Sequence, residues 1–212
     1  MATITTEGIV LKRRDFGEAD RVLTALTKQH GKISIIARGV RRITSRRAGN
    51  IELLNRVKLH LFKAKNYTLT EAEAIETFPR LKSNITLSTT AFHIIELVDR
   101  LVAENQINPF VYDLTVTILK ILEKNPRQIF IRSFEVKLLS LLGFWSPNAI
   151  HDLSDETRKL LTDLEQKSWG EINQIRLNEA KAQNLEMLMR SFIEKTIESN
   201  LKSVQVMKKI KL

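Results

Sequence analysis

The sequence predicts two domains of different class, a small β-barrel over residues 1–78 and an all-α domain over residues 79–212. Five of the seven glycines lie in the first fifty residues, whereas all four prolines follow residue 78. Short runs of β-branched and aliphatic residues fill the first part, and apolar residues at three-to-four spacing fill the second. Residues 1–78 hold 15 Lys/Arg against 8 Asp/Glu, and residues 79–212 hold 19 against 16. We therefore expect a basic, turn-rich barrel followed by a helical bundle.

Five runs in the first part have the composition of β-strands. They span residues 7–12, 21–28, 33–38, 56–62 and 67–77. Turn residues separate them, and Gly31 is expected at positive φ. A sheet of this size avoids exposed edges by closing on itself, and the five-stranded oligonucleotide-binding (OB) barrel is the common solution. The sequence thus predicts an OB-fold β-barrel.

The connection between the third and fourth predicted strands contains five arginines and no acidic residue between positions 38 and 47. We call this segment the arginine loop; its arginines are Arg38, Arg41, Arg42, Arg46 and Arg47. Arginine keeps its charge permanently, and its planar fork binds phosphate in a bidentate manner. Two interpretations stay open for the loop, a polyanion-binding site and a solvated run of charge.

Basic residues also occur in the two connections that frame the nucleic-acid face of an OB barrel, those between strands 1 and 2 and between strands 4 and 5. We expect their charges and those of the arginine loop to gather on one side of the barrel, without internal carboxylates to pair with. Phe62 and Tyr67 are candidate platforms for base stacking or, alternatively, part of the barrel core. Outside the arginine loop, the predicted DNA-binding residues are Lys12, Arg13, Arg14, Lys58, Lys63 and Lys65.

The second part of the chain has the pattern of a helical bundle, with helices predicted over residues 92–102, 111–122, 129–142, 155–167 and 178–209. Asn108-Pro109 and Asn125-Pro126 have the form of an N-cap followed by proline at the first helical position. Gly143 has the form of a C-terminal stop. Arg132 and Lys137 interrupt an apolar helix, where they either bind an acidic peptide tail of a partner or extend their charges from the edge of the core.

The overall composition excludes several classes of protein. A net charge of +10 and a pI near 9.9 indicate an acidic partner, either nucleic acid or an anionic membrane surface. The chain has no cysteine, which excludes disulfides, thiolate zinc sites and cysteine nucleophiles. Its start lacks a secretory signal, and no apolar run approaches the roughly 20 residues that span a bilayer. We expect a cytoplasmic, nucleoid-associated protein that does not bind membranes.

No catalytic constellation is visible, so we expect a protein that is not an enzyme and has no cofactor or metal. Glu71 and Glu73 share one face of a strand, as in some metal-assisted nucleases, but no further motif supports them and a solvated surface is favoured. Nucleophile-elbow and phosphate-loop motifs are absent. Four widely spaced histidines form no metal-binding pattern and are interpreted as surface or structural residues: His30, His60, His93 and His151.

Eight short motifs, spread in order over most of the chain, resemble one protein family. They are Gly8-Ile-Val-Leu, Gly17-Glu-Ala-Asp-Arg-Val-Leu-Thr-Ala-Leu-Thr, Gly31-Lys, Ala37-Arg-Gly-Val-Arg, Leu69-Thr-Glu-Ala-Glu, Arg132-Ser-Phe-Glu-Val-Lys-Leu-Leu, Leu142-Gly-Phe and Leu201-Lys-Ser. Together they resemble RecO, a bacterial family of recombination mediators in DNA repair. The family has an OB barrel followed by a helical domain.

The resemblance implies a function and a set of partners. It implies binding of single- and double-stranded DNA, annealing of complementary strands, and assistance in loading the RecA recombinase onto DNA coated by single-strand-binding protein (SSB). It also implies RecR as a partner and the acidic C-terminal tail of SSB as a ligand, with Arg132 at the family position for that tail. Many members carry a four-cysteine zinc module after the Leu-Gly-aromatic motif. Residues 145–154 contain no cysteine here, so zinc is not carried over.

Two other functions are compatible with the residues alone. One is a helical adaptor whose basic barrel docks on an acidic protein, and the other is an RNA- or ribosome-associated OB protein. Replacing the five loop arginines by glutamate separates DNA binding from the adaptor function. Competition between DNA and RNA of matched length addresses the other alternative.

Overall fold

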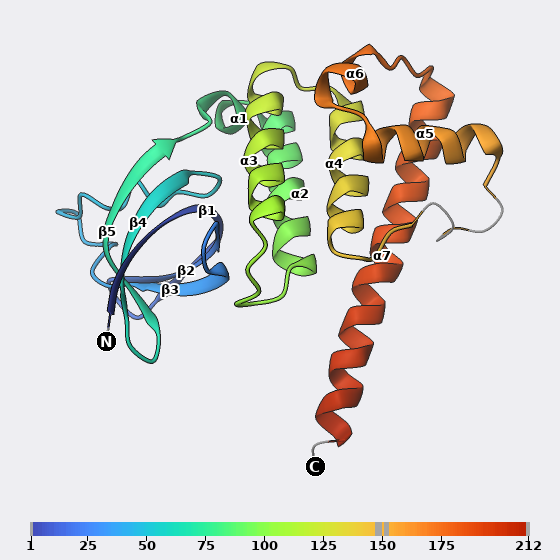
Figure 1. The fold of residues 1–212 in the computed structure, drawn as a ribbon. Coiled ribbons are helices and arrows are strands. Elements are labelled where there is room, and N and C mark those ends of the chain that lie inside the picture. Colours follow the sequence, from blue (N-terminus) through green and yellow to red (C-terminus); the bar gives the residue numbers. More distant parts are fainter. Residues whose placement is uncertain (1, 147–149, 151–152, 211–212) are drawn as a thin grey trace. The chain divides into compact units, whose positions relative to one another are not determined.

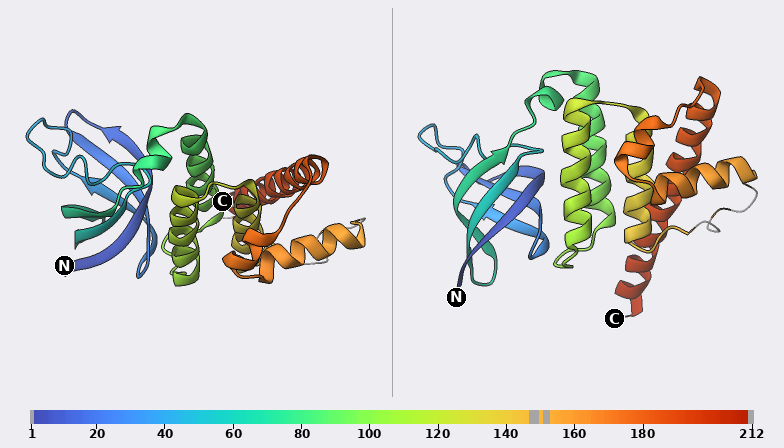
Figure 2. Two further views of the ribbon diagram at one scale, coloured as in Figure 1. Left: turned by 90° about the horizontal axis from the view of Figure 1, so that it is seen from above. Right: turned by 45° about the horizontal axis from the view of Figure 1, so that its top comes forward.

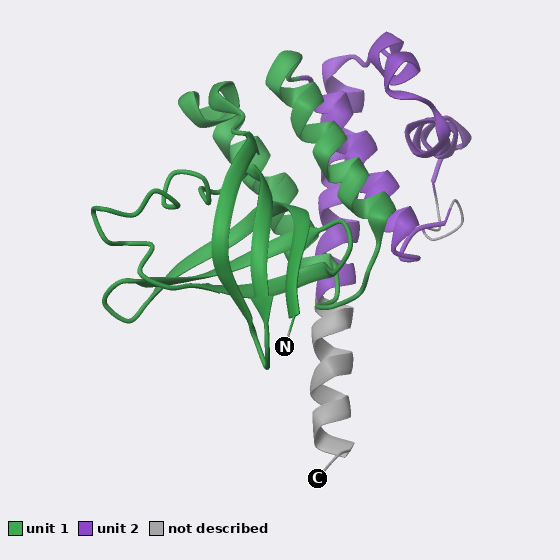
Figure 3. Cartoon of the chain, turned by 60° about the vertical axis from the view of Figure 1, so that its left-hand side comes forward, with its two compact units in different colours: residues 1–126 green, residues 127–212 purple. Residues whose placement is uncertain are grey.

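The structure, a computed structural model, describes residues 2–146, 150 and 153–210, with side chains through residue 197. The chain forms two compact units, residues 1–126 and 127–212 (Figure 3). The first contains all five strands and helices α1–α3, and the second contains α4–α7. The first unit therefore continues past residue 78, where the strands end. The predicted domain boundary at residue 78 stays a prediction.

The five strands close into a barrel in the order β1-β2-β3-β5-β4, as the OB-fold prediction requires (Figures 1 and 2). β1 is the longest strand and pairs with β4 through its first half and with β2 through its second half. Its register shifts between Val10 and Lys12, where a bulge lets one strand bend between two neighbours. The strands are β1 (Ala2–Phe16), β2 (Asp20–Thr27), β3 (Gly31–Ala37), β4 (Arg56–Lys63) and β5 (Tyr67–Glu76).

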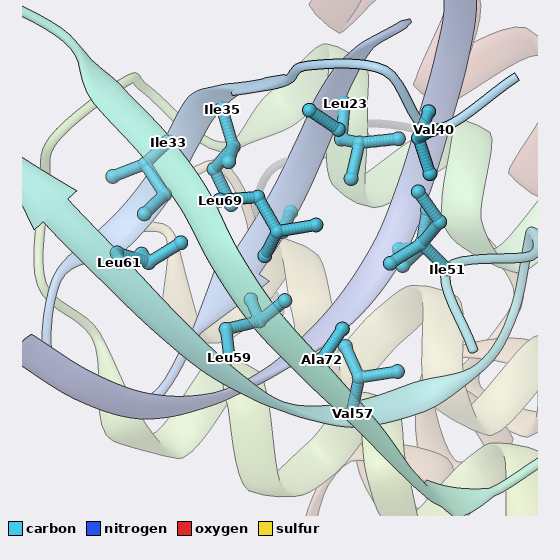
Figure 4. Close-up of a cluster of buried hydrophobic side chains, with 13 residues drawn as sticks. Leu23, Ile33, Ile35, Val40, Ile51, Val57, Leu59, Leu61, Leu69 and Ala72 are labelled. Atoms are coloured by element: carbon cyan, nitrogen blue, oxygen red, sulfur yellow. The ribbon is translucent and has the colours of Figure 1, made fainter. Parts of the chain in front are cut away.

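The barrel interior is filled by aliphatic side chains from every strand (Figure 4). Alternation along β4 places Val57, Leu59 and Leu61 inside, as the sequence predicted, because successive side chains of a strand point to opposite faces. Val40 and Ile51, which belong to the connection between β3 and β4, join the same cluster and close one end of it. The long connection is therefore attached to the barrel by its own core residues.

The barrel has one short seam. β3 and β5 are its only parallel neighbours, and they pair through just two positions, Ile35 with Tyr67 and Ile36 with Thr68. All other neighbouring strands are antiparallel and pair over at least seven positions. The carbonyl groups of β5 beyond Thr68 consequently need partners other than β3.

The turn between β2 and β3 depends on glycine. Gly31 has φ +68°, as predicted, and a Cβ atom at this position would lie 2.2 Å from the carbonyl oxygen of Gln106. Lys32 next to it donates to the carbonyl of Asp99 and pairs with its carboxylate at 3.6 Å. This end of β2 and β3 thus packs against α2 and the loop that follows it. The opposite end, where the arginine loop begins, points away from these helices (Figure 2).

Three helices complete the first unit: α1 (Pro79–Ser83), α2 (Ile85–Leu101) and α3 (Pro109–Lys124). Asn108 caps α3 by accepting a hydrogen bond from the backbone amide of Val111 at 3.1 Å, as predicted. Glu123 near the end of α3 accepts the amides of Arg80 and Leu81 at 2.9 Å each, which supplies partners to the free N–H groups of α1.

The barrel and α3 are joined by a polar cluster around Arg56. Its guanidinium contacts Glu7 at 2.6 Å, Glu76 at 3.0 Å and the hydroxyl of Tyr112 at 3.3 Å. Tyr112 is almost completely buried, and burial raises the pKa of its phenol to about 12. The hydrogen bond from Arg56 lowers the pKa of Glu7.

The second unit consists of α4 (Gln128–Leu141), α5 (Asp155–Gln166), α6 (Trp169–Gln174) and α7 (Glu179–Ile210). α4 is its central helix, and its buried apolar side chains include Ile129, Ile131, Phe134, Leu138 and Leu139. Gly143 ends α4 as predicted, with φ +76°. Its amide donates to the carbonyl of Ser140, and the amide of Phe144 donates to the carbonyl of Leu139, which together form a Schellman motif.

One predicted cap was wrong. Asn125 does not cap α4; it is the C-cap of α3, with its amide bonded to the carbonyl of Ile121 at 2.7 Å. Pro126 follows because proline cannot continue a helix, and α4 begins two residues later after Arg127. Two short helices, α1 and α6, were not predicted because five or six residues are too few to show helical periodicity.

Candidate nucleic-acid interface

The arginine loop is held in place by buried residues at both of its ends. Val40 is fully buried close to its start, and Ile51 and Leu54 are fully buried in the segment that returns to β4. Asn55 is also buried, and its side-chain amide donates to the carbonyls of Gly49 and Asn50 at 3.2 and 2.9 Å. The chain between these anchors projects from the barrel on the side away from α2 and α3 (Figures 1 and 2).

Arg47 joins the loop to the short seam of the barrel. Its guanidinium donates to the carbonyls of Leu69 and Thr70 on β5, at 3.1 and 3.3 Å, and to that of Arg38 at 2.8 Å. Asn50 donates to the carbonyl of Ala72 at 2.8 Å. Arg47 and Asn50 thus supply hydrogen-bond donors to carbonyls of β5 beyond Thr68, where the strand no longer pairs with β3. We therefore assign Arg47 primarily a structural role.

Arg41 joins the loop to the turn between β1 and β2. Its guanidinium donates to the carbonyl of Gly17 at 3.2 Å and pairs with Asp15 at 3.3 Å, while its amide bonds the carbonyl of Ala19 at 2.9 Å. The hydrogen bond from Arg21, supported by the charge of Arg41, lowers the pKa of Asp15. The β1–β2 turn and the arginine loop consequently form one connected surface.

Besides Arg47, whose guanidinium donates to backbone carbonyls, three arginines of the loop pair with no carboxylate among the described residues: Arg38, Arg42 and Arg46. They line an open cavity of about 590 Å³ together with Arg47, Asp20, Gly39, Thr44 and Ser45. Asp20 accepts the amide of Gly39 at 2.7 Å. The hydroxyl of Ser45 is buried and has no hydrogen-bond partner in the described part of the chain. The cavity is thus strongly cationic, with four arginines and one carboxylate in its lining.

The outer face of β1 and β2 extends this cationic surface. Lys12 and Arg14 are exposed and lie opposite Thr24 and Val22 on β2, so they share the outward face of the sheet. Neither has an ionic partner among the described side chains. Arg13 points to the other face, where it pairs with Glu52. The expectation that no internal carboxylate neutralises this surface thus holds for Lys12 and Arg14 and fails for Arg13 and Arg41.

The remaining predicted DNA-binding residues lie elsewhere on the barrel. Lys63 and Lys65 are exposed in the β4–β5 hairpin, and Lys63 is paired in register with Ala2, at the opposite end of β1 from the β1–β2 turn. Lys58 is exposed on β4, and its register partners on the two neighbouring strands are both acidic, Glu7 on β1 and Glu73 on β5. The structure therefore brings together the first connection and the arginine loop, but not these three lysines.

Of the two aromatic candidates, Tyr67 packs against the barrel core and has the ammonium of Lys63 5.1 Å from its ring centre. Phe62 on β4 is 36% exposed. Sequence reasoning missed a third aromatic residue, Phe16, which ends β1 and is 54% exposed. The signal was its spacing from Lys12 and Arg14 at every second position, which became visible only once β1 was known to reach residue 16.

In the second unit, Arg132 and Lys137 have partners within the protein. Arg132 is half-buried and pairs with the buried Glu135 one turn away at 2.9 Å. Lys137 donates to the carbonyls of Glu165 and Lys167 at the end of α5, at 2.6 and 2.9 Å, and burial lowers its pKa. A lysine that supplies hydrogen bonds to the last carbonyls of a helix has a structural function there.

His30, His60 and His93 lie apart from one another, and His151 lies outside the described residues. Among the side chains that the structure describes, no three acidic, histidine or cysteine groups come together as metal ligands would. In the same part of the chain, no helix is both long and apolar enough to cross a membrane.

A closed OB barrel with a basic loop, followed by helices, places the chain in the class of OB-fold proteins that carry a helical extension. Comparison with known proteins then identifies the family. Residues 1–78 match the family model "Recombination protein O N terminal" and residues 82–145 match "Recombination protein O C terminal". The chain belongs to the RecO family, as the sequence motifs indicated.

Curated relatives agree with this assignment. The chain is 36% identical over 148 residues to the DNA repair protein RecO of Symbiobacterium thermophilum, which covers 68% of this chain and 58% of that protein. The RecO protein of Acetivibrio thermocellus gives 36% identity over 148 residues, 68% of this chain and 59% of that protein. The RecO protein of Listeria monocytogenes is 33% identical over 141 residues, which covers 66% of this chain and 55% of that protein. The chain thus matches somewhat more than half the length of these relatives.

Proposed function

We propose that this protein acts in recombinational DNA repair by binding single- and double-stranded DNA and promoting the annealing of complementary strands. The observation that carries the proposal is the cavity lined by Arg38, Arg42 and Arg46, none of which forms an ion pair with a described carboxylate. Lys12 and Arg14 continue the same surface on β1. Membership of the RecO family supports the role in repair.

The physical basis of binding is neutralisation of phosphate charge. Guanidinium groups form paired hydrogen bonds with phosphate oxygens, and each neutralised phosphate releases bound counterions. Because these contacts involve the backbone of DNA, binding should depend little on sequence. Two strands held in this way repel each other less, so that complementary bases can pair.

A salt titration of charge-matched variants tests this function. Replacing Arg42 and Arg46 by glutamine removes two phosphate contacts, and the slope of log K against log salt should decrease by about two for duplex DNA. Fluorescence anisotropy with labelled oligonucleotides between about 50 and 300 mM salt measures this slope. Replacing Arg100 and Arg190, two exposed helical arginines, removes the same net charge and should leave the slope nearly unchanged.

Three results would contradict the proposal. Affinity of the wild-type protein that is flat across this salt range would exclude a phosphate-based interface. Equal losses in the two double variants would show that only net charge matters. Tighter binding of RNA than of matched DNA would favour the RNA-associated alternative.

We include RecR, RecA and the acidic tail of SSB as partners on the basis of the family resemblance. Arg132 is the proposed contact for the tail, and Lys137 lies five residues further along the same helix. Because Arg132 pairs with Glu135, a tail carboxylate would have to share or replace that partner. An acidic peptide with the tail's chemistry should therefore bind wild-type protein more tightly than an Arg132→Gln variant, and equal affinities would remove Arg132 from the proposal.

A further inference from the structure

Two large apolar side chains are exposed on the cationic surface formed by β1 and the arginine loop. Phe16 is 54% exposed and Ile43 is fully exposed. We propose that these two side chains contact unpaired bases and thereby make this surface selective for single strands over duplex. The inference rests on the proposed function and adds to it that the protein contacts the bases of the nucleic acid as well as its phosphates.

Phe16 is placed by the alternation of β1. From Lys12 to Phe16 the strand pairs with β2 without irregularity, so Lys12, Arg14 and Phe16 lie at every second position of one outward face. All three are exposed. A nucleic-acid backbone that follows the two cations would therefore reach the aromatic ring at the end of the row.

Ile43 is placed by the arginine loop. It follows Arg42 directly, in the exposed part of the loop between the anchors Val40 and Ile51. The contacts of Arg41 with Gly17 and Asp15 fix the base of this part of the loop against the turn that follows Phe16. Both apolar side chains thus belong to the connected surface of the loop and the β1–β2 turn.

The surroundings of these residues favour nucleic acid over a protein partner. Single exposed apolar residues are common, and the core of a protein–protein interface is depleted in charge. Here Phe16 lies directly opposite Asp20 in the pairing of β1 with β2 and is followed by Gly17 and Glu18, so its neighbours in the strand pairing and the turn are not apolar. Isolated aromatic platforms beside a row of cations are instead typical of proteins that bind single strands, where each base presents an apolar face.

The two side chains would act differently. The ring of Phe16 can stack on a base, which every unpaired base permits and a base inside a duplex does not. Ile43 has no ring, but its aliphatic side chain can pack against the apolar face of an unpaired base. Both contacts expose base edges, which is the state that a complementary strand needs for pairing.

Two ligands with identical phosphates separate base contacts from phosphate contacts. One is an oligothymidylate, and the other is an abasic oligomer of the same length. The wild-type protein should bind the oligothymidylate roughly 5- to 100-fold more tightly, because stacking on an aromatic contributes about 1–3 kcal/mol per base. Phe16→Leu and Ile43→Asn should each reduce this ratio at least twofold, while their affinity for the abasic oligomer stays at the wild-type value.

Phe110→Leu is the matched control, because it removes an exposed aromatic ring from α3 and should leave the ratio unchanged. Wild-type protein that binds the two ligands equally would overturn the inference while leaving the proposed function intact. Failure to bind either ligand would overturn the proposed function itself. If the Phe16 and Ile43 variants keep the full ratio, these side chains do not contact bases.

Discussion

Single arginines of the arginine loop differ in what their guanidinium groups contact. Arg47 donates to two backbone carbonyls of β5 and to that of Arg38, whereas Arg42 has no ion pair within the described residues and lines the cavity. The first arrangement satisfies carbonyl groups of the barrel, and the second leaves a charge available to a ligand. The two positions should therefore respond differently to substitution.

We predict that Arg47→Gln lowers the free energy of unfolding by about 1–2 kcal/mol, because carbonyls of β5 lose their hydrogen-bond donors. Arg42→Gln should change stability by less than about 0.5 kcal/mol, as expected for an exposed side chain. Urea denaturation of the two variants measures the difference. Equal stability of both proteins would contradict the structural role of Arg47.

The sequence predicted the charges at this site but not their partners. Five arginines in ten residues look alike in sequence, and Asp15 and Glu52, which pair with Arg41 and Arg13, lie in other segments. Their proximity depends on the path of the arginine loop around the barrel end, which no local pattern specifies. For the same reason Ser45 and Phe16 were not predicted as part of the site.

At the scale of elements, the contact between the barrel and α3 depends on Glu7, Arg56 and Tyr112. Arg56 lies 2.6 Å from Glu7, whose pKa it lowers by hydrogen bonding. Glu7 and Arg56 come from β1 and β4, and Tyr112 comes from α3. Arg56 also pairs with Glu76 at the end of β5, so the cluster connects three strands to a helix.

We predict that Glu7→Gln lowers the free energy of unfolding by about 1 kcal/mol at neutral pH, a value reduced for the 39% exposure of this side chain. Because the folded protein lowers the pKa of Glu7, the stabilisation is complete above the ordinary value of 4.5 and is lost as pH falls through the lowered pKa. The difference between the two proteins should thus shrink in acid. Urea unfolding across pH measures it.

Glu186→Gln, an exposed substitution on α7 with the same change of charge, is the control and should leave stability nearly unchanged at each pH. A wild-type advantage over Glu7→Gln that grows on acidification would show that the carboxylate is not the stabilising group.

Periodicity predicted the five strands and the five longer helices, because each buries a face with a regular spacing. The Asn125-Pro126 pair was misinterpreted since the same two residues can begin a helix or follow one. Which of the two applies depends on where the preceding apolar stripe ends, and α3 runs up to Lys124.

At the scale of the whole molecule, the strands share one compact unit with α1–α3. Lys32 contacts Asp99, Lys28 pairs with Asp113 at 3.1 Å, and Tyr112 is buried beside Arg56. α2 and α3 therefore belong to the first unit together with the strands.

We predict that a fragment of residues 1–126 folds and retains most of the DNA affinity, whereas a fragment of residues 1–78 is strongly destabilised. The shorter fragment loses the buried contacts of α2 and α3, each large side chain of which contributes about 1.5–3 kcal/mol. Circular dichroism during urea titration, combined with oligonucleotide binding, compares them. A shorter fragment as stable as the longer one would place the boundary at residue 78.

The short seam between β3 and β5 couples ligand binding at the arginine loop to closure of the barrel. Only two residue pairs join these strands, and Arg47 completes the closure from within the arginine loop. If binding of a polyanion orders the loop, it also stabilises the closed barrel. Closure of the barrel must then strengthen binding of the polyanion by the same free energy. Amide protons of β3 and β5 should accordingly exchange with solvent more slowly when the ligand is bound.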